Sequence, residues 1–204
     1  MGKIINQCNI FALLLFCLIS LSLFACSMSA EEYYDSAFNK GMDGNTAAAI
    51  VALDKAISID STKWYYFGLR GSMKYRNGDY LGALKDLSHS IVLNPNDYML
   101  FLMRGKTFIA VRDYDAAIKD LSRSSEILPE RVMPYMYRGF SKYMKRDING
   151  AMADFNLAVE LCPSWKTYFA RGITRISDGD FLKGLIDLFY AIINMEINII
   201  ESGR

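Results

Sequence analysis

One spacing recurs through most of the chain and constrains its fold more than any other feature. Aspartates follow one another at steps of 34, 34 and 33 residues, at Asp79, Asp113, Asp147 and Asp180. Prolines repeat the 34-residue step at Pro95, Pro129 and Pro163. A fixed period of this length indicates an array of small structural units, each of which buries its apolar face against the next unit. The sequence therefore predicts a repeat protein rather than a single globular core.

Each unit has the same internal plan. A glycine such as Gly71 lies in the first half, and a small residue such as Ala83 lies in the second half. Two helices can cross closely only where such side chains leave room between their axes. The aspartate between the two halves, such as Asp79, is suited to cap the second helix. The period, the small residues and the terminal proline together resemble the tetratricopeptide repeat (TPR) family.

The resemblance implies an all-α fold, in which about five helix pairs stack into a right-handed superhelical solenoid. The array is predicted over residues 31–198, with repeats that start near positions 30, 64, 98, 132 and 165. The first copy is degenerate, because Ser61 stands where later copies have proline. A short tail, residues 199–204, is expected to follow the last repeat.

Four arginines are each followed by an aspartate 16 positions later. The pairs are Arg70 with Asp86, Arg104 with Asp120, Arg138 with Asp154, and Arg171 with Asp187. In the first copy both charges are missing, since Ser36 and Ala52 occupy the two positions. Their joint absence predicts that the pairs are structural salt bridges, within or between repeats, that fix the register of the helices.

The TPR resemblance also implies where a partner binds, because the first helix of each unit lines the concave surface in that family. At those positions most side chains are apolar, and methionine and aromatic residues dominate. The predicted groove residues are Tyr65, Leu69, Tyr75, Met99, Leu102, Met103, Met133, Met136, Tyr137, Phe140, Tyr143, Phe169 and Ile173. Methionine-rich surfaces adapt to the shape of a partner, so the expected occupant is a protein or a peptide.

Two alternatives to a protein-binding groove stay open. The same side chains would also serve to pack neighbouring repeats against one another, since methionine stripes are common in cores. The second alternative is an accessory protein of a transport system, in which the groove holds a small hydrophobic ligand.

No motif for catalysis, cofactor binding or metal binding stands out, so an enzyme is not expected. The chain has no glycine-rich phosphate loop, GxSxG, HExxH or CxxC pair, and His89 is its only histidine. Without the first 25 residues, which carry one charge at Lys3, 22 basic side chains remain against 22 acidic ones. A neutral chain lacks the surplus of Lys and Arg that binds phosphates, so nucleic acid is not an expected partner.

Residues 1–25 have the pattern of an export signal. Lys3 is followed by an apolar run from Ile10 to Leu23 and then by small residues. This run is shorter than the roughly 20 apolar residues of a membrane span. An uncleaved anchor that stretches to Ala30 stays an alternative.

The end of this run, Leu23-Phe24-Ala25-Cys26, resembles a bacterial lipobox. The resemblance implies cleavage before Cys26, lipidation of that cysteine, and a short tether over residues 26–30. It also implies a membrane-anchored protein of the bacterial envelope that faces the periplasm. In the enterobacterial sorting rule, an aspartate after the lipidated cysteine retains a lipoprotein in the inner membrane. Because Ser27 stands at this position, that rule implies the outer membrane.

Two further expectations concern Cys162 and the carboxyl end. Cys162 precedes Pro163 and is expected to be a small packing residue, with no partner for a disulfide in the mature chain. Beyond the expected end of the fifth repeat near Met195, Ile197 and Ile200 remain apolar. Either the last helix extends over the fifth repeat, or an apolar face docks onto a second copy or another partner. We favour docking, because exposed apolar patches usually mark interfaces.

Overall fold

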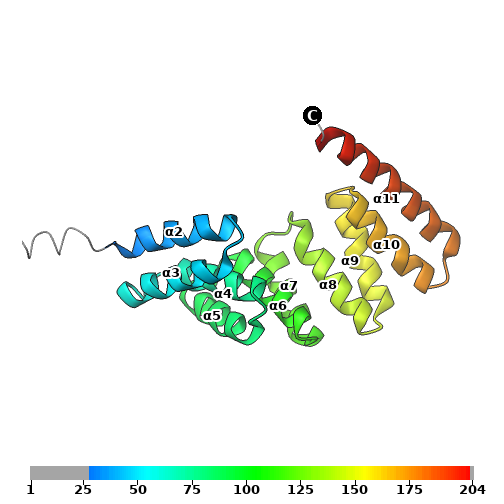
Figure 1. The fold of residues 1–204 in the computed structure, drawn as a ribbon. Helices are drawn as coiled ribbons and strands as arrows, with labels where there is room; N and C mark the ends of the chain where they lie inside the picture. Colours follow the sequence, from blue (N-terminus) through cyan, green and yellow to red (C-terminus); the bar gives the residue numbers. More distant parts are fainter. Residues whose placement is uncertain (1–27, 203–204) are drawn as a thin grey trace, which may run out of the picture.

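The computed structural model describes the chain from Met28 to Ser202, with side chains described as far as Met195. This part is built from α-helices alone, arranged as a stack of helix pairs (Figure 1). The first helices of the five pairs are α2 (Ala30–Met42), α4 (Trp64–Arg76), α6 (Tyr98–Ala110), α8 (Val132–Met144) and α10 (Trp165–Ser177). The second helices are α3 (Thr46–Ile59), α5 (Tyr80–Leu93), α7 (Tyr114–Ile127), α9 (Ile148–Leu161) and α11 (Phe181–Ser202).

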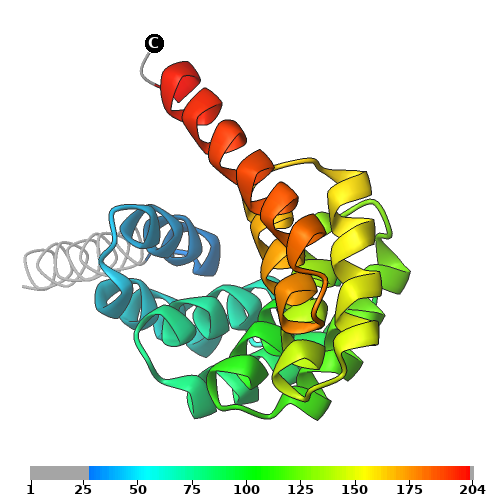
Figure 2. The same cartoon turned by 90° about the vertical axis from the view of Figure 1, so that its right-hand side faces the viewer.

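The helices form two rows along the stack. Each helix packs against the next one in the chain, and each first helix also touches the first helices of the neighbouring repeats. Successive pairs turn about the long axis, as the view along the stack shows (Figure 2). The predicted all-α superhelical solenoid of five helix pairs is therefore confirmed, and the first helices start at the five expected positions.

Small residues let the two helices of a pair cross closely. A Cβ atom built on Gly71 would lie 2.8 Å from Cγ of Leu87, and one on Gly105 would lie 2.8 Å from Cγ of Leu121. Ala83 is completely buried at the same crossing. Any larger side chain at these glycines would force the helix axes apart.

The turns inside each pair follow from two local features. The Asp79 carboxylate caps α5 by accepting a hydrogen bond from the backbone N–H of Gly82 at 2.9 Å, and Asp113 and Asp147 cap α7 and α9 in the same way. Just before each cap the backbone enters the left-handed region. The residues with positive φ are Gly44, Gly78, Arg112, Arg146 and Gly179.

Arg112 is a non-glycine residue at a turn position where other repeats carry glycine, with φ of 63°. Replacing Arg112 by Gly is expected to raise the free energy of unfolding by about 0.5–1 kcal/mol. The left-handed backbone penalises a Cβ by about 1–2 kcal/mol, and the extra freedom of glycine in the unfolded chain offsets part of that relief. Urea unfolding would measure the change. The matched control Arg123→Gly, at an exposed site inside α7, should instead destabilise the protein.

The last helix departs from the expected boundary. The other second helices have 14 residues each, whereas α11 has 22 and continues to Ser202. Residues 199–202 therefore belong to α11 rather than to a tail, and the helix projects beyond α10 (Figure 1). The side chains of Ile197 and Ile200 lie outside the described part. Within residues 28–202, no helix has both the length and the apolar character needed to cross a bilayer.

Candidate functional site

The predicted arginine–aspartate pairs all form, each between the two helices of one repeat. In repeat 2, Arg70 donates from Nε to Asp86 Oδ2 at 2.8 Å and from Nη2 to Asp86 Oδ1 at 2.7 Å. The same two-pronged geometry joins Arg104 to Asp120, Arg138 to Asp154, and Arg171 to Asp187. All four aspartates are buried. Two parallel charge-assisted bonds fix the relative position of the helices.

The third nitrogen of three of these arginines reaches back to the preceding repeat. Nη1 of Arg70 donates to Asp54 on α3 at 2.7 Å, and Nη1 of Arg104 donates to Ser88 on α5 at 3.0 Å. Arg138 makes the equivalent bond to Ser122 on α7 at 3.2 Å. Sequence reasoning missed these acceptors, although their spacing of 34 residues was a usable signal. Each of these guanidinium groups thus bonds to two repeats at once.

A second cation supports three of the four aspartates. Lys74 lies 2.9 Å from Asp86, and the corresponding positions in repeats 4 and 5 are Lys142 and Arg175. Burial by itself would raise the pKa of Asp86, but the hydrogen bonds from Arg70 and Lys74 hold that pKa below its usual range. These side chains bond to one another across the two helices of a repeat, so the contacts hold the helices together.

The candidate binding site is an apolar cleft between α8 and α10. Its volume is about 540 Å³, and α6 contributes to its wall. The lining residues are Ile109, Val132, Met133, Met136, Tyr137, Phe140, Phe155, Cys162, Ser164, Lys166, Thr167 and Ala170. Phe140 is 41% exposed and Met133 is 47% exposed, so an occupant has apolar surface to cover there. Four predicted groove residues therefore come together in one cleft.

The other predicted groove residues lie outside this cleft. Met99, Phe169 and Ile173 are exposed on neighbouring first helices. Tyr65, Leu69, Tyr75, Met103 and Tyr143 are half-buried. The hydroxyl of Tyr65 donates to Glu31 Oε1 at 2.5 Å, and this bond raises the pKa of Tyr65. Apart from the four in this cleft, the predicted groove residues are therefore spread over the first helices of the array.

Two sequence expectations about single residues were wrong. Leu102, expected in the groove, is only 5% exposed, because it packs against Ala117 and Leu121 in the core between α6 and α7. Cys162, expected to be a packing residue, is exposed and lines the cleft. It caps the end of α9 with extended backbone, so its side chain leaves the helix interface.

A cation lies beside the cleft. The ammonium of Lys106 on α6 sits 5.5 Å from the ring centre of Tyr75 and 5.2 Å from that of Tyr137. Contacts of this kind attract a cation to the ring face. Since Tyr137 also lines the cleft, an occupant with apolar groups and a nearby acidic group would match this surface.

Nothing in the described part resembles a metal centre, since residues 28–195 contain no group of three potential ligands. Cys26, the predicted lipidation site, lies outside the described residues.

The fold has clear counterparts among solved structures. MamA from Desulfovibrio magneticus RS-1 superposes with a TM-score of 0.77 at 17% identity, over 82% of this chain and 95% of that one. A crystal structure of MamA gives 0.74 at 17% identity, over 80% of this chain and 96% of that one. TTC0263, a thermophilic TPR protein in Thermus thermophilus, gives 0.66 at 12% identity, over 86% and 98% of the two chains.

Sequence comparison adds nothing to this, since no protein-family model and no curated protein matches the chain. At identities this low, the likeness concerns the fold rather than the function. The helix pairs, their 34-residue period and these counterparts agree, and the chain has the fold of a tetratricopeptide-repeat solenoid.

Proposed function

We propose that this protein is a non-catalytic scaffold that binds a protein or peptide partner through the cleft between α8 and α10. The observation that carries the proposal is the exposure of Met133 and Phe140 over an apolar cavity of about 540 Å³. Covering such side chains contributes about 25 cal/mol for each Å² of apolar surface removed from water, from which the entropy cost of association is subtracted. The repeat fold supplies a rigid frame for this surface.

The surroundings of the cleft favour an elongated occupant. Exposed apolar side chains continue beyond it at Phe169 and Ile173 on α10 and at Met99 on α6. A helix or an extended peptide spans several such positions, whereas a small molecule fills one cavity. The alternative, a small hydrophobic ligand, is supported by the volume of the cleft, which falls in the usual range for ligand pockets.

Phe140→Glu is expected to weaken partner binding at least about tenfold, because it puts a charge into an apolar interface. The full-length protein carrying a photo-crosslinking residue at Met133 would be irradiated in cells, with and without the change. Mass spectrometry would then identify crosslinked proteins and co-purifying small molecules. Val92→Glu is the matched control, since Val92 is an exposed apolar residue of α5 away from the cleft.

The outcomes of this experiment separate the two functions. One recurrent protein partner that Phe140→Glu removes and Val92→Glu leaves in place supports the scaffold. A hydrophobic small molecule without any protein partner would instead establish the ligand-holding alternative.

The proposal includes a lipid tether that holds the array in the bacterial envelope, facing the periplasm, at the outer membrane. Its support is the lipobox-like sequence that ends at Cys26. The first helix begins at Ala30, where Ser29 and Glu32 form a capping box, so little chain separates tether and array. Four residues reach roughly 15 Å when extended. The partner in this proposal is therefore part of an envelope complex close to the bilayer.

Cys26→Ala is expected to release the protein from the membrane fraction and to stop its labelling with palmitate. Stable anchoring by acyl chains requires at least two of them, and both would depend on this cysteine. Fractionation of cells that express either form would measure the effect, with Cys17→Ala as a control inside the leader. A mutant that still partitions with membranes, together with an unlabelled wild type, would contradict the tether.

Self-association through the carboxyl-terminal helix is the last part of the proposal. Leu182, Leu185 and Phe189 are all exposed on α11 at helical spacing, and no later repeat covers them in the described chain. Exposed apolar side chains that share one helix face are typical of an interface.

A further inference from the structure

One position on the second helix of a repeat is contacted by the arginine of the next repeat at the first three junctions of the array. The position held by Asp54 on α3 is held by Ser88 on α5, Ser122 on α7, Asn156 on α9 and Phe189 on α11. In the first three cases the arginine of the next repeat contacts this residue. Phe189 has no next repeat in the described chain and is 61% exposed. A large apolar side chain thus replaces a polar acceptor at the end of the array.

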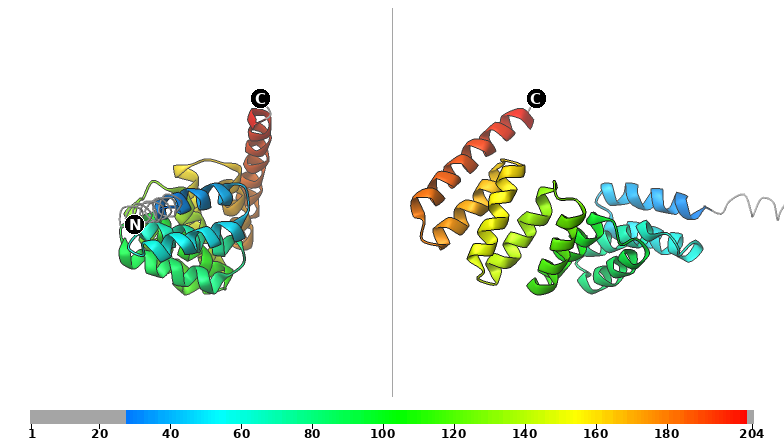
Figure 3. Two further views of the ribbon diagram at one scale, coloured as in Figure 1. Left: turned by 60° about the vertical axis from the view of Figure 1, so that its left-hand side comes forward. Right: turned by 180° about the vertical axis from the view of Figure 1, so that it is seen from behind.

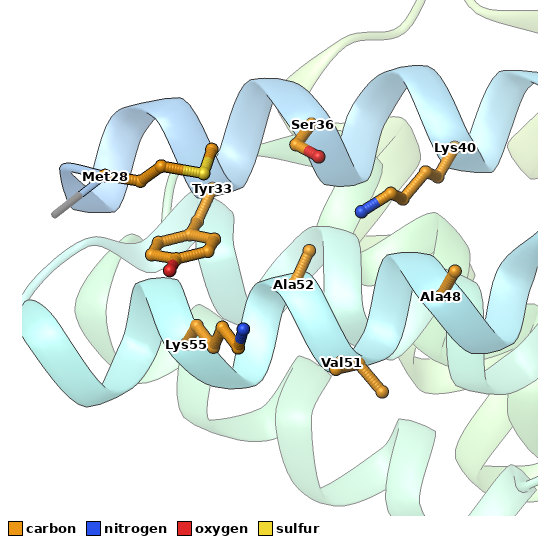
Figure 4. Close-up of a pocket in the computed structure, with 8 residues that line it drawn as sticks. All are labelled: Met28, Tyr33, Ser36, Lys40, Ala48, Val51, Ala52 and Lys55. Atoms are coloured by element: carbon orange, nitrogen blue, oxygen red, sulfur yellow. The ribbon is translucent and has the colours of Figure 1, made fainter. Parts of the chain in front are cut away.

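The opposite end of the array has a matching change. Repeat 1 carries Ser36 on α2 where the other repeats carry arginine, and Ala52 on α3 where they carry aspartate. These small residues lie in an open pocket of about 450 Å³ between α2 and α3 (Figure 4). The pocket is lined by Met28, Tyr33, Ser36, Lys40, Ala48, Val51, Ala52 and Lys55.

The two changes fall on positions that the solenoid itself would bring together. At the first three junctions inside the chain, the arginine of one repeat meets the acceptor position of the repeat before it, as Arg70 meets Asp54. A second copy stacked in the same register would therefore bring its Ser36 against Phe189 of the first copy. The helices α2 and α11 lie at opposite ends of the array (Figure 3). The α11 end of one copy can therefore meet the α2 end of another copy.

We propose that copies of this chain associate head to tail, with Phe189 of one copy inserted into the pocket between α2 and α3 of the next. This inference rests on the self-association in the proposed function and names the surface that receives α11. A large side chain fills the hole that two small residues leave, which is the packing that interfaces require.

The rim of the pocket suits an aromatic guest. Lys40 and Lys55 lie at its edge, and the ammonium of Lys55 already sits 5.3 Å from the ring centre of Tyr33. Lysine stems cover apolar surface while their charged ends stay in water. A second ring beside these ammonium groups gains the same cation–π attraction. The pocket therefore has room for the ring of Phe189 and places it beside Tyr33 and two ammonium groups.

A head-to-tail contact joins two different surfaces, so it propagates into chains of copies unless the geometry closes a ring. A symmetric contact between two α11 helices would stop at a dimer. Full-length protein extracted in detergent and studied by sedimentation velocity over a range of concentrations distinguishes these cases. We expect species larger than dimers that grow with concentration.

A sharper test replaces the residues of the proposed contact between copies by the charged residues that join repeats inside the chain. Phe189→Asp should weaken association at least about tenfold, and so should the pair Ser36→Arg with Ala52→Asp. Combining all three changes should restore association, since it recreates the arrangement of Arg70, Asp54 and Asp86 between two copies. Val92→Asp is the control and should have no effect.

Each outcome decides the proposal. Dimers that Phe189→Asp abolishes but the Ser36 and Ala52 changes leave intact would establish a symmetric tail contact and overturn the head-to-tail arrangement. Monomers at every concentration would overturn self-association altogether. Neither result affects crosslinking at Met133, which reports on the cleft of the proposed function. Circular dichroism and retained partner binding would show that the variants are folded.

Discussion

Replacing Asp120 by Ala is expected to lower the free energy of unfolding by about 3 kcal/mol, which is more than the loss expected from removing both members of its ion pair. Asp120 is buried, and its carboxylate accepts from Nε and Nη2 of Arg104 at 2.7 and 2.9 Å. Without it, a largely buried guanidinium keeps only Ser88 as a hydrogen-bond partner in the described chain. Breaking such a pair from one side typically costs about 3–5 kcal/mol.

Repeat 3 is the best place for this test, because Phe108 stands where other repeats carry the second cation. The double change Arg104→Met with Asp120→Leu removes both charges and fills the space with apolar atoms, so a smaller loss is expected. Urea unfolding of the two single variants and the double variant gives the coupling energy. The exposed pair Arg123–Glu126 is the control, and Glu126→Ala should change stability by less than about 1 kcal/mol. Strictly additive losses for Arg104 and Asp120 would contradict a pair.

Gly105→Val is expected to destabilise the protein by about 2–3 kcal/mol. Even a single Cβ there would lie 2.8 Å from Cγ of Leu121, which is completely buried. Overpacking a filled helix crossing costs about 1–3 kcal/mol, and valine adds two further methyl groups to the Cβ. Thermal unfolding monitored by circular dichroism would measure the loss.

Two controls separate crowding from helix propensity. Lys119→Val places the same β-branched residue at an exposed site of α7, away from the helix crossing. This change should lower the free energy of unfolding by less than about 1 kcal/mol. Leu121→Ala combined with Gly105→Val should be less destabilising than the sum of the two single changes, because the alanine vacates the space that valine needs. If the losses simply add, the crossing is looser than the structure indicates.

The helix pairs and the ion pairs were predictable because both repeat. A 34-residue period fixes where helices begin and which positions face one another, so the partnership of Arg70 with Asp86 follows from spacing alone. The contact of Arg70 with Asp54 was missed, because the acceptor changes from aspartate to serine in later repeats. A repeat pattern is read most easily where the residue type is constant.

The groove was predicted less well, because a position in a repeat does not determine how deeply its side chain is buried. Leu102 occupies a concave position by the TPR register, yet Ala117 beside it is small enough to let it turn into the core. Cys162 lies in a connection after α9, where no helical periodicity applies. The end of α11 was also missed, since its apolar residues fit either an extended helix or a tail.

The bonds of the arginines to the preceding repeat make the cohesion of the solenoid uneven. Arg138 donates hydrogen bonds to Ser122 and Ser125 of repeat 3. In the described chain, Arg171 donates its hydrogen bonds to Asp187 of its own repeat. In an array where stability is a sum of unit terms and nearest-neighbour terms, the junction before repeat 5 therefore lacks a contribution that the earlier junctions have. We therefore expect cooperativity to weaken toward the carboxyl end, so that helices α10 and α11 open as a unit before the first four repeats unfold.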